Sequence, residues 1–171
     1  MPKLRAYYQL LKPGVMYGNV LTGAAGFMLA AAGQVDWWLF AATIVGMTLV
    51  VGSACALNNY LDRDIDSKMT RTLKRPSVTG EVPGWSIVVY AAVLGLAGTA
   101  ILALWTNWLV VAIGIVGWIT YVWFYGAWSK RQSVHGTLVG SISGAMPIAG
   151  GYAAVSGQID LGLIVAFLVL F

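Results

Sequence analysis

Three polar residues spaced four apart carry the clearest chemical pattern of this sequence. Asn58, Asp62 and Asp66 come at the end of a long apolar run, which predicts the end of a membrane helix. Four residues are a little more than one helical turn, so the three side chains return to nearly the same face, about 6 Å apart. Mg²⁺ is commonly bound through one or two carboxylates together with substrate phosphates. We therefore interpret Asn58, Asp62 and Asp66 as the candidate catalytic residues, holding Mg²⁺ and through it a diphosphate.

We call the shared face of Asn58, Asp62 and Asp66 the acidic face. Basic residues follow it in the sequence and would complete a clamp around the phosphates. The candidates for binding the diphosphate are Arg71, Lys74 and Arg75, together with Lys130 and Arg131 from a later segment. Asp64 lies about 200° round the helix from Asp62, so we expect it in solvent or in an ion pair. Two simpler interpretations stay open: the acidic residues could form a solvated loop, and the basic ones could contact anionic lipid head groups.

The composition is that of an integral membrane protein. Of the 171 residues 59% are hydrophobic and only 9% are charged, against about 25% charged in soluble domains. The net charge of +4 does not indicate nucleic-acid binding, because the basic residues gather at the ends of apolar runs. Cys55 is the single cysteine, inside an apolar run, and we interpret it as a small packing residue.

Apolar runs separated by short turns predict an all-α transmembrane bundle. The expected spans are 14–32, 38–58, 85–104, 109–128, 136–155 and a last run at 161–171. A membrane helix needs about 20 apolar residues, and the last run has only 11. We therefore expect residues 1–171 to be one domain and an N-terminal fragment, with five complete helices and a sixth that is cut.

The charges predict an orientation. In this assignment all ten Lys and Arg residues fall on one side, whereas the opposite turns carry only Asp36 and Asp160. The positive-inside rule then places the N-terminus and the acidic face in the cytoplasm. Trp37, Trp38, Trp105 and Trp108 fit an aromatic belt at the opposite interface.

The strings around these residues resemble a known family. Asn58-x-x-x-Asp62-x-x-x-Asp66 resembles the first aspartate-rich motif of the UbiA superfamily of intramembrane prenyltransferases. The longer string 53–66, followed by Met69, Arg71 and Arg75, resembles its haem O synthase (protoheme IX farnesyltransferase) branch. The segments 11–19 and 125–145 also resemble that branch. The second segment includes Tyr125, Lys130 and Arg131, and the resemblance implies Tyr125 as a further diphosphate-binding residue.

This resemblance implies a fold and a reaction. It implies about nine transmembrane helices around a central cavity, farnesyl diphosphate as donor and haem B as acceptor, with Mg²⁺ as cofactor. It implies haem O as product, for terminal oxidases, in the inner membrane of a bacterium, with haem-handling or oxidase-assembly proteins as possible partners. The family also uses a second acidic motif after the sixth helix, so a chain of this length would hold half of the metal site and be inactive alone.

Several alternatives remain at this point. The acceptor could be an aromatic acid, a quinone precursor or a chlorophyll-type tetrapyrrole, and an ion-coupled transporter is a third class, less consistent with charges at helix ends. Asn19 could line the cavity or bond to a neighbouring helix, and we expect His135 to be an ordinary loop residue. Gly136, Gly140 and Gly144 repeat every four residues, which favours close helix packing.

Overall fold

The chain folds into a bundle of helices. The computed structural model describes residues 2–129 and 136–171, and all regular elements in these two ranges are helical. Five helices are long and apolar enough to cross a membrane: α2 (Pro13–Ala31), α3 (Trp37–Leu61), α6 (Gly84–Trp105), α7 (Trp108–Ile119) with its continuation η1 (Thr120–Ser129), and α9 (Gly136–Ser156). The shorter helices are α1 (Pro2–Leu10), α4 (Arg63–Asp66), α5 (Pro76–Thr79) and α10 (Leu161–Leu170). The predicted all-α membrane bundle is confirmed.

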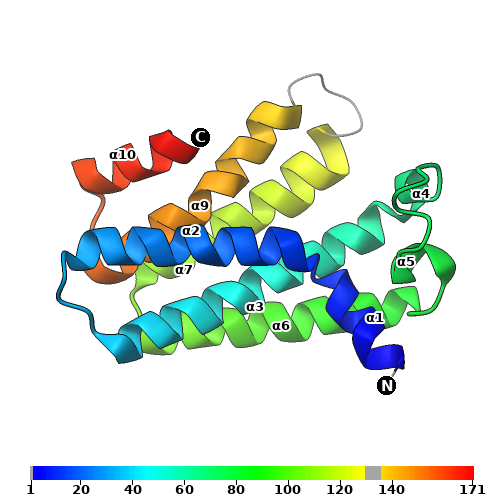
Figure 1. Cartoon of the computed structure of the whole chain (residues 1–171), viewed down its shortest axis with the longest axis horizontal. Coiled ribbons are helices and arrows are strands. Elements are labelled where there is room, and N and C mark those ends of the chain that lie inside the picture. Colours follow the sequence, from blue (N-terminus) through cyan, green and yellow to red (C-terminus); the bar gives the residue numbers. More distant parts are fainter. Residues whose placement is uncertain (1, 130–135) are drawn as a thin grey trace.

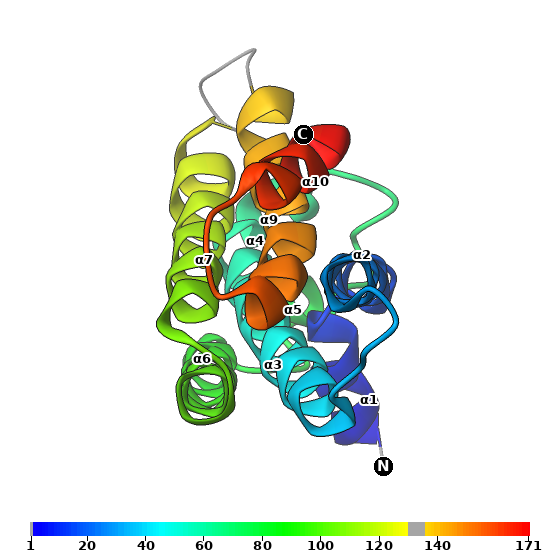
Figure 2. The ribbon, with the colours of Figure 1, turned by 90° about the vertical axis from the view of Figure 1, so that its left-hand side faces the viewer.

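The long helices lie side by side (Figure 1). Helix α3 packs along α6 on one side and contacts α2 on the other, while α2 packs along α9. An end-on view shows α3 between α2 and α6, with α7 and α9 above them (Figure 2). The polar end of α3, with Asn58 and Asn59, is buried.

Helices α2 and α9 approach each other through glycines. A Cβ atom at Gly26 would lie 2.1 Å from the carbonyl oxygen of Ile148, and one at Gly151 would lie 1.9 Å from the carbonyl oxygen of Gly23. Only a residue without a side chain allows two backbones to come this close. The first and fifth spans are therefore fixed against each other at mid-length.

Capping residues set the ends of the helices where the sequence predicts turns. Pro13 opens α2 at its first turn. Asp36 accepts hydrogen bonds from the backbone of Trp38 and Leu39 at the start of α3, and Asp160 accepts one from Leu163 at the start of α10. These side chains satisfy backbone N–H groups that a helix start leaves without partners.

The two ends of the bundle differ in charge. Helices α1, α4 and α5 gather at one end, with the described basic residues of segments 3–12 and 63–75 (Figure 1). Asp36 and Asp160 lie in the turns at the other end. The described part of the chain therefore has the charge asymmetry on which the predicted orientation is based, although the orientation itself stays a prediction.

Three elements differ from the expectation. The second span was expected to end at residue 58, but α3 continues to Leu61, and the polar segment after it forms α4 and α5. The N-terminal segment, for which no element was expected, forms α1, which buries Ala6 and Leu10 against Ala56 and Ile87. The fourth span widens into a π-helix at η1, a form that is rare and often lies at functional sites. The assignment of residues 1–171 to a single domain stays a prediction.

Candidate active site

The acidic face is intact and buried. Asn58, Asp62 and Asp66 are 1%, 0% and 2% exposed. Helix α3 ends before Asp62, so the expected single helix is interrupted. The amide of Asp62 nevertheless donates to the carbonyl of Asn58 at 2.9 Å, and that of Asp66 to the carbonyl of Asp62 at 2.8 Å. These bonds have the four-residue spacing of an α-helix, so the break does not turn the three side chains away from one another.

The neighbours of this face have other surroundings. Asp64 is exposed, as its position round the helix predicts. Asn59 is buried, but its Nδ2 donates to the carbonyl oxygen of Leu10 at 2.7 Å, which ties α3 to the end of α1. Asn59 therefore has a structural contact and lies outside the candidate site.

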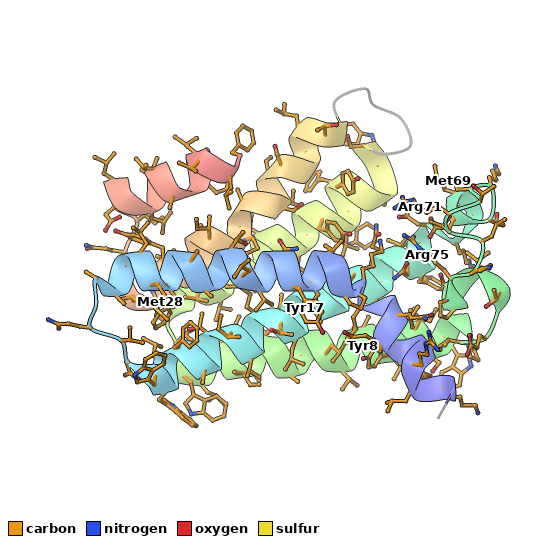
Figure 3. The ribbon with its side chains drawn as sticks, in the orientation of Figure 1. Tyr8, Tyr17, Met28, Met69, Arg71 and Arg75 are labelled. Carbon is orange, nitrogen blue, oxygen red and sulfur yellow. The ribbon has the colours of Figure 1, made fainter. Side chains whose placement is uncertain are left out.

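The loop after the acidic face is fastened to Asp66. The guanidinium Nη1 of Arg75 donates to Oδ2 of Asp66 at 2.5 Å. The hydroxyl of Thr72 donates to the backbone carbonyl of Asp66 at 2.7 Å, and Thr72 is buried. Arg71 and Arg75 lie beside α4 at the same end of the molecule (Figure 3). Of the predicted phosphate ligands, Arg75 thus contacts the acidic face, whereas Arg71 and Lys74 are exposed.

Lys12 belongs to this site, and the sequence analysis missed it. Its Nζ donates to Oδ1 of Asn58, across 46 positions of the chain. Lys12 lies between α1 and α2 in a left-handed conformation, with a φ of 49°. The Nδ2 atom of Asn58 is buried and has no hydrogen-bond partner among the described residues. An ammonium group can only donate a hydrogen bond, so the amide atom that Lys12 contacts must be the oxygen of Asn58. The NH₂ group of Asn58 is therefore the end of the amide that does not contact Lys12.

Gly126 in η1 leaves space for the side-chain amide of Asn58. A Cβ atom at Gly126 would lie 2.7 Å from Nδ2 of Asn58 and 3.2 Å from the carbonyl oxygen of Tyr121. The wider turn of η1 therefore brings a residue without a side chain against the acidic face. No sequence pattern predicted this contact, because the width of a helix is not read from apolar spacing.

An apolar cavity of about 180 Å³ begins next to the acidic face. Its walls come from α2, α3, α6, α7 with η1, and α9, and Cys55 lies in the wall one turn of α3 before Asn58. Asn19 also lines the cavity, while its Nδ2 donates to the carbonyl of Val15. Gly140 and Gly144 face the same space, and nothing lies within 4 Å of a Cβ placed at Gly144. The helix-packing role expected for Gly144 is therefore wrong.

Two tyrosines of η1 lie in or beside the cavity wall. Tyr121 lines the cavity. Its ring stacks on that of Tyr125, with centroids 5.8 Å apart. Tyr125, a predicted phosphate ligand, packs against Gly140. Cys55 is buried, as expected, and it also contributes to a cavity wall.

The donor atoms fit a magnesium site completed by other ligands. In the ranges 2–129 and 136–171, no three side chains of His, Cys, Asp or Glu come together. Two buried carboxylates one helical turn apart are nevertheless the protein contribution that Mg²⁺ commonly has, with water and phosphate in the other positions. Lys130, Arg131 and His135 lie outside the described residues, so the structure does not place them.

Curated proteins of similar sequence match nearly all of this chain. A protoheme IX farnesyltransferase 2 of Chromobacterium violaceum is 50% identical over 166 residues, which are 97% of this chain and 55% of that protein. The protoheme IX farnesyltransferase of Marinomonas sp. (strain MWYL1) is 49% identical over 158 residues, 92% of this chain and 53% of that protein. The chain thus spans about half the length of the curated relatives it matches.

A solved structure and a family model match the same helices. A membrane structure of digeranylgeranylglyceryl phosphate synthase superposes with a TM-score of 0.87 at 18% identity, covering 99% of this chain and 59% of the other. At this identity the likeness concerns the fold alone. The model of the UbiA prenyltransferase family matches residues 19–171. The chain is therefore part of an integral membrane protein and belongs to the UbiA prenyltransferase family.

Proposed function

We propose that the whole protein carrying this chain transfers a farnesyl group from farnesyl diphosphate to a vinyl group of haem B, which gives haem O. The observation that carries the proposal is that Asn58, Asp62 and Asp66 are buried and follow directly, along the chain, the part of α3 that lines an apolar cavity. A polar head and an apolar tail are the two parts of a prenyl diphosphate. The relatives at about 50% identity, named protoheme IX farnesyltransferases, support haem B as acceptor.

Different residues of the site would bind the metal ion and the phosphate groups of the donor. Asp62 and Asp66 would hold Mg²⁺, since their carboxylates are the hard oxygen ligands that it prefers. The Oδ1 atom of Asn58 is already engaged by Lys12, so Asn58 presents its NH₂ group, which donates. We therefore assign Asn58 to a phosphate oxygen. Lys12 and Arg75 would neutralise the diphosphate, and Arg71, Lys74, Tyr125, Lys130 and Arg131 remain predicted contacts.

The chemistry replaces the bond from farnesyl C1 to oxygen and the π bond of the vinyl group with one carbon–carbon bond and one carbon–oxygen bond. The bond between farnesyl C1 and the diphosphate oxygen breaks, and its electron pair leaves with the diphosphate. The vinyl group attacks the allylic cation, and water then adds to the product cation as a hydroxyl and loses a proton. Bound Mg²⁺ would supply Lewis-acid polarisation of the leaving group. Lys12 and Arg75 favour the same step, because they stand where negative charge gathers.

The cavity walls protect the reactive cation from water. Its described lining is apolar except for a few groups, such as Asn19, Tyr121 and Ser143. We place the acidic face at the cytoplasmic side of a bacterial inner membrane, where the basic residues agree with the positive-inside rule. Haem-handling or terminal-oxidase assembly proteins are the proposed partners.

The test uses the purified full-length protein with haem B, farnesyl diphosphate and Mg²⁺. The proposal expects haem O and released diphosphate in equal amounts, and no product after removal of divalent metal. Prenyl transfer to an added aromatic acid or quinone precursor, with haem B unchanged, would show that the acceptor is wrong.

A further inference from the structure

A groove that shares no residue with the cavity lies between α1 and the start of α6. It is lined by Leu4, Arg5, Tyr7, Tyr8, Leu11 and Tyr90. The ring of Tyr7 packs edge-on against that of Tyr90, with centroids 5.0 Å apart, and its hydroxyl is hydrogen-bonded to that of Ser86. The hydroxyls of Tyr8 and Tyr17 are 2.6 Å apart, which ties α1 to α2 (Figure 3). The aromatic walls of the groove are therefore held by contacts with two spans.

The position of the groove on α6 gives its depth. The bond to Ser86 places Tyr7 at the first turn of α6, where the exposed Trp85 also lies, and tryptophan is enriched at membrane–water interfaces. Tyr90 follows Ser86 by four residues, which is about 6 Å further along this apolar span. A molecule in the groove would therefore have one end among lipid head groups and the other among acyl chains.

The α1 side of the groove is basic. Helix α1 carries Lys3 and Arg5 and no acidic residue. Arg5 is exposed, and within residues 2–129 and 136–171 its guanidinium has no ion pair or hydrogen bond. A guanidinium can bind two oxygens of a phosphate at once. Leu4, the neighbour of Arg5 in the groove, is 78% exposed, so an apolar contact is offered beside the charge.

We propose that this groove binds one anionic phospholipid, with Arg5 on the head group and an acyl chain along Leu4, Leu11 and Tyr90. A soluble phosphate ester would leave the apolar side chains of the groove uncovered, whereas a phospholipid covers both parts. A zwitterionic lipid carries its own cation beside the phosphate, so the unpaired charge of Arg5 favours an anionic one. The bound lipid would hold α1 against α6 and so stabilise the folded bundle.

The experiment measures lipid binding to the full-length protein in detergent. Native mass spectrometry with added phosphatidylglycerol or phosphatidylcholine of the same acyl chains gives the Kd of the first bound lipid. The wild type should bind phosphatidylglycerol about tenfold more tightly than phosphatidylcholine. Arg5→Gln should weaken phosphatidylglycerol binding by about tenfold or more, because it removes charge-assisted hydrogen bonds, and should leave phosphatidylcholine within about twofold.

Two further variants separate the parts of the groove. Lys3→Gln is the matched control, since it removes the same charge from the same helix at an exposed residue outside the groove lining. Its loss should be at most about fivefold, the general attraction of one basic residue to anionic lipid. Leu4→Ser removes apolar contact and should weaken both lipids alike, by about threefold to tenfold. Phosphatidylglycerol should also raise the thermal midpoint of the wild type more than phosphatidylcholine does, and Arg5→Gln should abolish this difference.

Equal Kd values of the two lipids in the wild type would overturn the lipid site. Equal losses of phosphatidylglycerol binding in Arg5→Gln and Lys3→Gln would do the same, because they would indicate a general attraction to the surface. Displacement of the bound phosphatidylglycerol by farnesyl diphosphate would assign the groove to the donor instead. None of these measurements uses haem B, so the lipid site and the proposed reaction can fail separately.

Discussion

The guanidinium of Arg75 donates to the carboxylate of Asp66 at 2.5 Å, although nine positions separate them in the sequence. The Asp66 side chain is 3% exposed and that of Arg75 is 27% exposed. A buried carboxylate needs a partner of opposite charge, and the loop after α4 supplies one. The loop and the acidic face therefore form one unit, in which a proposed metal ligand is held by a proposed phosphate ligand.

Loss of either buried carboxylate should stop the reaction. Asp62→Ala and Asp66→Ala in the full-length protein should lower kcat by about a hundredfold or more. Each removes a proposed ligand of the Mg²⁺ that would stabilise the negative charge of the leaving diphosphate. Membrane insertion should be unchanged, which an immunoblot of the membrane fraction would check. Asp64→Asn is the matched control: Asp64 is exposed, and the loss should stay below about tenfold. Haem O formation at the wild-type rate by Asp62→Ala would contradict the assignment of Asp62 as a Mg²⁺ ligand.

Lys12 should act on donor binding. Lys12→Met removes the ammonium group that contacts Asn58, and a hydrogen bond to a charged group contributes about 1.5–3 kcal/mol. We expect KM for farnesyl diphosphate to rise by about tenfold or more, with a smaller change in kcat. Lys12→Arg keeps the positive charge, so its KM for farnesyl diphosphate should lie between those of the wild type and Lys12→Met. Steady-state kinetics over a range of donor concentrations gives both constants, and a wild-type KM in Lys12→Met would contradict the role.

Gly126 should be required for the position of Asn58. In Gly126→Ala the new methyl group would start 2.7 Å from Nδ2 of Asn58, so the amide must move. Overpacking of this kind costs about 1–3 kcal/mol, and we expect a loss of donor binding together with a lower thermal midpoint. Gly18→Ala is the control, since Gly18 is exposed, lies outside the cavity lining and has nothing within 4 Å of its Cβ position. Equal behaviour of the two variants would argue against the contact with Asn58.

Thr72 should protect the loop against proteolysis. Thr72→Val keeps the shape of the side chain but leaves the buried carbonyl of Asp66 without this hydrogen bond, worth about 0.5–1.5 kcal/mol. Trypsin should then cleave after the exposed Arg71 and Lys74 about threefold to tenfold faster in detergent. Thr72→Ser retains the hydroxyl and should resemble the wild type. Equal cleavage rates of the valine and serine variants would show that the hydrogen bond does not hold the loop.

Patterns within one helix were predictable from the sequence. The apolar runs gave the long helices, and the spacing of Asn58, Asp62 and Asp66 gave their common face, because both depend only on local helix geometry. The exposure of Asp64 followed from the same geometry.

Contacts between distant segments could not be read in this way. Lys12 reaches Asn58 from 46 positions away, and Gly126 reaches it from another helix. Such contacts depend on how α2, α3 and η1 pack. The same reason explains why Gly144 was assigned to helix packing, although it faces the cavity: a repeat of small residues does not tell a packed face from an open one.

The most direct test of the account is the mass of the haem extracted from bacteria that lack their own haem O synthase and express the full-length protein carrying this chain. The account predicts a new haem species with the added mass of a hydroxyethylfarnesyl group, present with the wild-type protein and absent with Asp62→Ala. Good expression of the wild-type protein with haem B as the only haem would contradict the proposed acceptor.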